Sequence, residues 1–323
     1  MRIALYAVTL FFAFTTSLLA QVSQWSGVGG SWQNTDFSKS SINFNEILDG
    51  GPGKDGIPAI TNPSFLNVAD ENRLSDLEPV MTVELEGEVP RAYPIRYLMW
   101  HEIVNDSAGD HHFAVTFCPL CNSGIVFDRR FDGGIIELGV SGLLRNSDMV
   151  MYDRGTESWW QQFTGEGIVG TYTGRKLDKI PGWMESWGDF KKRNPNGLVQ
   201  DEPNARRQYG INPYIQYDSG SFSLYRGESP PHGINPVERV IVIEDNAWPL
   251  SRLRRAVRLI EKGYTITWSP GLASALDTRQ ISAGKDVGSI RVQDADGNDV
   301  VHDVAFAFAF HAFFPEGNWM VGH

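Results

Sequence analysis

Cys118 and Cys121 are the residues whose type and spacing point most directly to chemistry. They stand in the segment Cys118-Pro119-Leu120-Cys121 and are the only two cysteines among 323 residues. Two sulfurs at this spacing can bind one metal ion or close a disulfide, and thiolate ligands suit copper or zinc. The residues alone leave three interpretations open: a metal site, a cycling redox pair and a structural disulfide.

His101 and Glu102 precede the cysteines by one short loop and one predicted strand. If the chain turns back there, His101 joins Cys118 and Cys121 in a three-ligand copper or zinc site with an open coordination position. Glu102 would then orient the imidazole or act as a general base. The alternative for His101 is a buried histidine with a purely structural role.

Asp153, Arg154 and Glu157 form a second polar group within one predicted hairpin. Asp153 and Glu157 are a candidate acid/base pair, and Arg154 can bind an anion through two parallel hydrogen bonds. These residues support a different hypothesis, a hydrolase- or transferase-type enzyme in which the cysteines form only a disulfide. An ion pair within a turn is the structural alternative, and a non-catalytic binding module is a third hypothesis for the whole protein.

The elements that must position these residues are mainly strands. Alternating or continuous apolar runs predict strands over residues 79–85, 113–117, 124–131, 135–140 and 148–152, and the second of these runs directly into Cys118. A short helix is expected over 95–101. With 33 glycines and 17 prolines marking many turns, the sequence predicts a β-rich α+β fold.

An internal similarity divides the chain into two related parts, about 79–197 and 238–318. Val80 to Glu84 followed by Ala92-Tyr93-Pro94 resembles Val240 to Glu244 followed by Ala247-Trp248-Pro249. We therefore expect two degenerate pseudo-repeats of strand-helix-strand units that share one core. Only the first repeat carries two thiols.

The first 20 residues have the pattern of a secretory signal peptide: a cation, a short apolar stretch and a small residue, Ala20. Residues 21–56 are rich in Gly, Ser, Asn and Asp and are predicted to be an extended leader, followed by a single β-rich domain over 57–323. No later stretch has the length of a membrane-spanning helix. We expect a periplasmic or extracellular protein with no stable membrane insertion of its mature chain. The alternative for residues 1–20 is an uncleaved membrane anchor.

The formal net charge of −11 makes nucleic acid an unfavourable partner. The sequence also lacks a Gly-x-Ser-x-Gly elbow, a phosphate-binding loop, a His-Glu-x-x-His motif and a Cys-x-x-Cys-His haem site. A small molecule or a metal ion is therefore the expected partner, and copper or zinc the expected cofactor.

Five ordered motifs resemble a family of exported bacterial proteins known as domain of unknown function 3179. The resemblance runs from about Pro58 to Pro315. It is carried by Arg91-Ala92-Tyr93-Pro94, Trp100-His101-Glu102-Ile103-Val104-Asn105-Asp106, Phe117-Cys118-Pro119-Leu120-Cys121, Gly139-Val140-Ser141-Gly142 and Met151-Tyr152-Asp153-Arg154 with Thr156-Glu157-Ser158. It implies that His101, the cysteines, Asp153, Arg154 and Glu157 belong to a family pattern, and it implies no particular activity.

Overall fold

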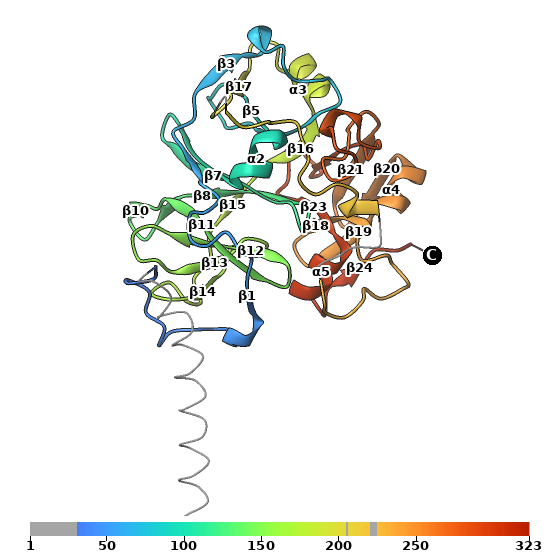
Figure 1. The fold of residues 1–323 in the computed structure, drawn as a ribbon. Helices are drawn as coiled ribbons and strands as arrows, with labels where there is room; N and C mark the ends of the chain where they lie inside the picture. The colour runs from blue at the N-terminus through green and yellow to red at the C-terminus, as the bar shows by residue number, and fades with distance from the viewer. Residues whose placement is uncertain (1–30, 205, 220–224, 323) are drawn as a thin grey trace, which may run out of the picture.

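The computed structural model describes residues 31–204, 206–219 and 225–322 (Figure 1). Within these residues, short strands build five small sheets that are arranged like the blades of a five-bladed β-propeller. The α-helices are α2 (Ile95–His101), α3 (Trp187–Arg193), α4 (Leu250–Ala256) and α5 (Ala307–Phe313). The predicted β-rich character is confirmed. The predicted signal peptide lies outside the described residues.

Sheets 1 and 2 are formed by the first part of the described chain. Sheet 1 has the order β16 (Trp183–Ser186), β4 (Pro79–Val83), β5 (Arg91–Pro94), β17 (Leu198–Gln200) and β3 (Phe65–Asn67). Sheet 2 has the order β15 (Lys179–Ile180), β8 (Ser123–Asp128), β7 (His111–Cys118), β6 (Ile103–Ala108) and β2 (Ile60–Thr61). The continuous apolar pattern of β4 follows from its burial on both faces.

Sheet 3 packs next to sheet 2 and contains the hairpin that completes the candidate site. Its order is β1 (Ile47–Asp49), β11 (Leu138–Arg145), β12 (Asp148–Asp153), β13 (Trp159–Gln161) and β14 (Gly167–Val169), and a small ribbon, β9 (Arg130–Phe131) with β10 (Gly134–Ile135), precedes it. The Asn105 side chain joins the two sheets, because its amide binds both the carbonyl (2.8 Å) and the N–H (3.0 Å) of Leu138.

Sheets 4 and 5 come from the last third of the chain. Sheet 4 has the order β20 (Arg258–Glu261), β21 (Tyr264–Ser269) and β22 (Ser289–Gln293). Sheet 5 has the order β23 (Asp303–Phe306), β18 (Arg239–Ile243), β19 (Asn246–Pro249) and β24 (Asn318–Trp319). Short 3-10 helices lie at η1 (Phe44–Glu46), η2 (Val68–Asp70), η3 (Tyr217–Ser219) and η4 (Ile281–Ala283).

Sheets 1 and 5 share one strand arrangement, in the two places where the sequence repeats itself. In sheet 1, β4 pairs antiparallel with β5 and β16, and β17 runs parallel to β5. In sheet 5, β18 pairs antiparallel with β19 and β23, and β24 runs parallel to β19. The largest difference between the two parts is the run β11–β14 of sheet 3, which lies between β8 and β16 and has no counterpart between β22 and β23.

Residues 31–56, predicted to be an extended leader, pack against sheet 3. β1 adds to the edge of β11, and the side chains of Trp32, Phe44 and Ile47 are buried there. The Trp32 ring lies 5.3 Å from the ring of Trp159, edge to face. This segment is therefore part of the folded body (blue in Figure 1) and not a separate tail.

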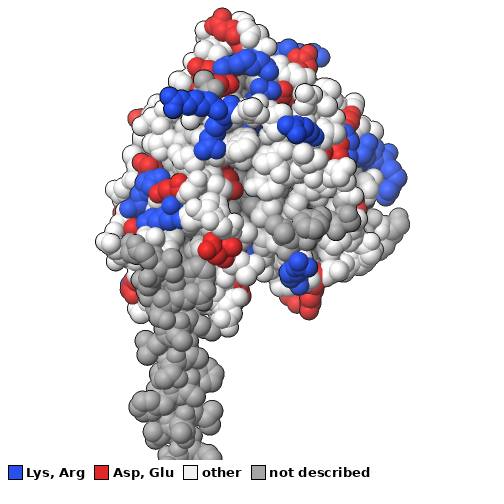
Figure 2. Space-filling model, viewed as in Figure 1, with Lys and Arg blue, Asp and Glu red and all other residues white. Residues whose placement is uncertain are grey.

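The largest apolar core joins sheets 1, 2, 3 and 5, with residues such as Met81, Phe117, Trp160 and Phe306. Sheet 4 packs through a separate cluster, in which Ile266 and Ile290 contact Ile241 and Trp248 of sheet 5. Each of the four α-helices has seven residues, and no helix of the described residues has the length and apolarity needed to cross a membrane. On the face shown in Figure 2, acidic and basic side chains are interspersed and neither sign dominates.

Candidate metal centre

The cysteines lie on the turn that connects β7 to β8. Cys118 is the last residue of β7 and pairs with Ser123, the first residue of β8. The turn between them is closed by a hydrogen bond from Asn122 N–H to the carbonyl of Pro119 (3.2 Å), and Asn122 adopts a left-handed φ of 52°. Both cysteines are free, and their exposed fractions are 1% and 0%. The predicted structural disulfide is not formed in this structure.

A second hairpin brings oxygen atoms to the two thiols. Arg145 of β11 pairs with Asp148 of β12, so the turn between them contains only Asn146 and Ser147. Both have left-handed φ values, 51° and 60°, as a type I′ turn requires. The turn points the Ser147 carbonyl at the cysteines: its oxygen lies 3.3 Å from Cys121 Sγ and 3.9 Å from Cys118 Sγ.

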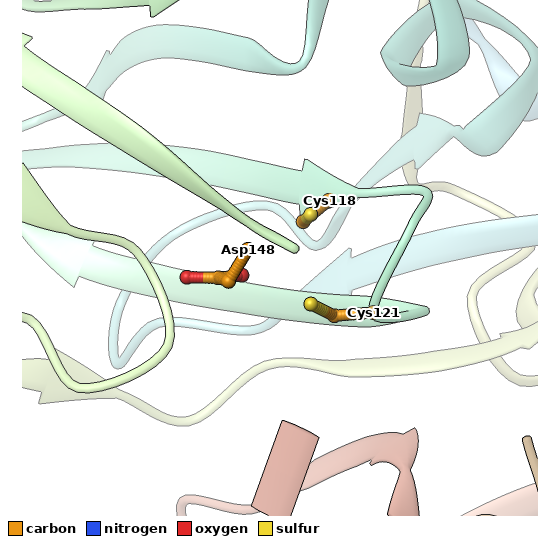
Figure 3. Close-up of side chains that lie close together, drawn as sticks. All are labelled: Cys118, Cys121 and Asp148. Atoms are coloured by element: carbon orange, nitrogen blue, oxygen red, sulfur yellow. The ribbon is translucent and has the colours of Figure 1, made fainter. Parts of the chain in front are cut away.

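Cys118, Cys121 and Asp148 form a compact group of potential metal ligands. The two sulfurs and one carboxylate oxygen all lie within 4.8 Å of one another, and Figure 3 shows the three side chains converging. One of the two carboxylate oxygens, Oδ2, accepts hydrogen bonds from Gln161 Nε2 (2.6 Å) and Phe163 N–H (3.0 Å). Asp148 is thus anchored through one oxygen, while Oδ1 receives no N–H or O–H hydrogen bond.

The pKa values in this region shift because acidic groups are buried close together. Burial raises the pKa of Asp148 to about 6 and that of Cys118 above its ordinary value, and it places the pKa of Cys121 well above that value. Glu102 is also buried, and burial together with the charge of Asp148 raises its pKa to about 8. Without a bound cation, these raised pKa values favour the protonated forms of the two thiols, Asp148 and Glu102. A divalent ion would displace these protons and bind the ionised groups.

His101, predicted as a ligand together with Cys118 and Cys121, is not a member of this group in the described residues. The two ring nitrogens of His101 bind the Pro58 carbonyl and the Tyr209 hydroxyl, each at 2.7 Å. His101 ends α2, and the next residue, Glu102, has a left-handed φ of 56°. The imidazole itself lies at the loops around Pro58 and Tyr209, and burial there lowers its pKa.

Glu102, predicted as a general base, lies next to the strand that carries the first thiol. Its backbone carbonyl accepts a hydrogen bond from Phe117 N–H (2.8 Å), one residue before Cys118. Its carboxyl group is close enough to Asp148 and Cys118 to raise the pKa of the Cys118 thiol further. The structure therefore places Glu102 beside the thiol-carboxyl group as a fourth acid.

Asp153 has its polar atoms engaged within its own turn. It accepts hydrogen bonds from Thr156 N–H (2.6 Å), Ser158 N–H (3.2 Å) and Trp160 Nε1 (3.1 Å). These contacts fix the connection between β12 and β13. Asp153 therefore has a structural role in this turn, which is the alternative to an acid/base role.

Arg154 and Glu157 bind the N-terminal segment that covers sheet 3. Arg154 pairs with Asp55 (3.0 Å) and also with Glu137 (2.9 Å), and Glu157 pairs with Lys54 (2.6 Å). The structure therefore uses Asp153, Arg154 and Glu157 to hold a turn and a covering segment, and it does not gather them with the thiols.

Asp148 is the site residue that sequence reasoning missed. The available signal was an aspartate directly after Asn146-Ser147, a pair suited to a tight turn, at the start of the buried strand β12. A carboxyl group buried at the tip of a hairpin is a functional candidate because its desolvation must be compensated. Its meeting with the cysteine turn depends on the packing of sheet 3 against sheet 2.

The fold and the site together define a class: a β-rich, propeller-like protein with a buried pair of thiols and a carboxyl group between two sheets. A family described as "Protein of unknown function (DUF3179)" matches residues 54–317, and the chain belongs to this family. The resemblance noted in the sequence is thereby confirmed. Neither a curated protein nor a solved structure matches the chain.

Proposed function

We propose that this is an exported metal-binding protein that holds one zinc ion through Cys118, Cys121 and Asp148. The observation that carries the proposal is the convergence of two sulfurs and a carboxylate oxygen within 4.8 Å in a fully buried place. Buried acids of this kind need a compensating cation or must stay protonated.

Zinc fits the donor set better than copper. Two thiolates alone would suit Cu(I), but a carboxylate is a hard oxygen ligand, and the mixture of sulfur and oxygen suits the borderline Zn²⁺ ion. Zinc commonly takes four ligands. The Ser147 carbonyl, 3.3 Å from Cys121 Sγ, can supply the fourth position.

The burial of the centre favours a stabilising metal over a metal exposed to substrates. The cysteine turn belongs to sheet 2 and the Asp148 hairpin to sheet 3, so one ion would connect two blades. In an oxidising compartment, a bound metal would also protect the thiols from disulfide formation. A redox pair that exchanges with other proteins is disfavoured because Cys118 and Cys121 are only 1% and 0% exposed.

The test is the metal content of the full chain, purified without chelator, and of three variants. We expect about one zinc per chain, and a loss of most of it in Cys118→Ser, Cys121→Ser and Asp148→Asn. Ser269→Ala is the matched control, because Ser269 ends β21 as Cys118 ends β7. It should keep its zinc.

Three results would contradict the proposal. The first is a metal-free protein with a stable Cys118–Cys121 disulfide, shown by thiol counting after denaturation. The second is zinc that survives all three substitutions. The third is copper in place of zinc in the protein as purified without added metal; a competition between added metals would not decide this, because copper binds most thiolate sites more tightly than zinc.

A further inference from the structure

A separate cleft of about 740 Å³ lies between sheet 2 and sheet 5. The edge strand β15 and the segment before β23 form its sides, and the three proposed metal ligands do not line it. Its volume is typical of small-molecule sites. Much of its wall is apolar, formed by Ile125, Phe163, Val242, Tyr264, Val300 and Phe314.

Lys179 supplies a cation to this cleft. Its ammonium donates one hydrogen bond to the Phe163 carbonyl (2.8 Å), and an ammonium has three donors. Burial lowers the pKa of Lys179 to about 8, and the nearby carboxyl groups of Asp303 and Asp148 oppose this shift. The remaining donors suit an anionic acceptor.

Asp303 supplies a fixed carboxyl group to the same cleft. It is 6% exposed and accepts hydrogen bonds from Ser123 Oγ (2.6 Å) and Gly124 N–H (3.0 Å). Each carboxylate oxygen can accept a further hydrogen bond. Lys179 and Asp303 influence each other electrostatically, yet they form no direct ion pair in the described part of the chain. A ligand with both a positive and a negative group can therefore connect them.

The mouth of the cleft is more acidic than basic. Asp178, Glu244 and Asp245 are exposed there, against one exposed lysine, Lys176. A purely anionic ligand would meet repulsion from these carboxylates, whereas a ligand that also carries an ammonium group would not.

We propose that this cleft binds an amino-acid zwitterion with an apolar side chain. The ligand carboxylate binds the Lys179 ammonium, the ligand ammonium binds Asp303, and the side chain packs between Phe163, Val242 and Phe314. This inference does not depend on zinc at the thiol centre, since a different set of residues forms the cleft.

The experiment is calorimetric titration of the full chain with L-phenylalanine and two analogues, 3-phenylpropionate, which lacks the ammonium, and 2-phenylethylamine, which lacks the carboxylate. We expect phenylalanine to bind and each analogue to bind at least about tenfold more weakly, because each loses one charged hydrogen bond. Lys179→Met should weaken phenylalanine binding by a similar factor. Lys176→Met, the matched control at the rim, should leave it unchanged.

The two analogues test the roles of Asp303 and Lys179 on the unmodified protein, so the test does not require that any variant folds. If phenylalanine and 3-phenylpropionate bind with equal affinity, Asp303 does not bind the ligand ammonium. If phenylalanine and 2-phenylethylamine bind with equal affinity, Lys179 does not bind the ligand carboxylate. Either result would contradict the proposal. An equal loss in Lys176→Met and Lys179→Met would show a general charge effect. Absence of binding by all three compounds would overturn the proposal. Cys118→Ser should bind phenylalanine normally, which separates this result from that of the metal analysis.

Discussion

At the scale of single residues, the two carboxylate oxygens of Asp148 have different surroundings: Oδ2 is hydrogen-bonded to the protein and Oδ1 is not. Oδ2 is fixed by Gln161 and Phe163, so the carboxyl group cannot turn away from the thiols. Oδ1 receives no N–H or O–H donor. With Glu102 beside it, four acidic groups share a place from which water is excluded. A cation is the simplest compensation for such a group.

Glu102 makes the stability of the metal-free protein depend on pH. Its folded pKa of about 8 lies above the ordinary 4.5, so folding retains a proton that the unfolded chain loses. Below pH 4.5 the residue is neutral in both states and has no effect. Between pH 4.5 and pH 8 it destabilises the fold increasingly as the pH rises. Glu102→Gln should therefore stabilise the metal-free protein at pH 8 by on the order of 4 kcal/mol relative to its effect at pH 4.

Urea unfolding of both proteins at the two pH values measures this difference. The exposed Glu86→Gln serves as the control and should show almost no pH-dependent change. A Glu102→Gln effect that is the same at both pH values would show that Glu102 is ionised in the folded protein, against our account of the buried acids.

At the scale of elements, two turns build the centre. The β7–β8 turn presents the sulfurs, and the β11–β12 turn presents Asp148 and the Ser147 carbonyl. Each turn contains a residue with left-handed φ, Asn122 in the first and Ser147 in the second. The positions of the ligands therefore depend on backbone conformations that β-branched residues disfavour.

Ser147 offers a direct test of the second turn. Ser147→Gly relieves the left-handed conformation and keeps the backbone carbonyl, so zinc affinity should be retained. Ser147→Val places a β-branched side chain at a φ of 60°, which costs about 1–2 kcal/mol and displaces the hairpin tip. Zinc affinity, measured by competition with a chromophoric chelator, should fall by about tenfold or more. Equal affinities in the two variants would show that the hairpin does not set the ligand geometry.

Strand positions were predictable, whereas the partners of the cysteines were not. The run from Phe113 to Phe117 predicts a strand that ends at the first thiol, and β7 ends at Cys118. His101 is near the cysteines in the sequence, but its ring nitrogens bind Pro58 and Tyr209. Asp148 reaches the thiols through contact between two sheets, which hydrophobic periodicity within one strand does not encode.

At the scale of the whole molecule, the internal similarity predicts shared topology but not the ring of sheets. The matching segments do form equivalent pairs, β4 with β5 and β18 with β19. Sheet 3 occurs once, so a search for repeats cannot reveal it, although it carries Asp148. The second half also supports the thiol turn, because Phe306 N–H binds the Cys121 carbonyl (2.8 Å) and Asn122 Nδ2 binds the Val304 carbonyl (2.7 Å).

The central claim is that one zinc ion joins sheet 2 to sheet 3 through two sulfurs and a carboxylate. Zinc-edge X-ray absorption of the intact protein tests it most directly. We predict two sulfur neighbours at about 2.3 Å and one or two oxygen neighbours at about 2.0–2.2 Å, with one oxygen signal altered in Asp148→Asn. Imidazole scattering from a histidine ligand, or a zinc shell without sulfur, would contradict the account.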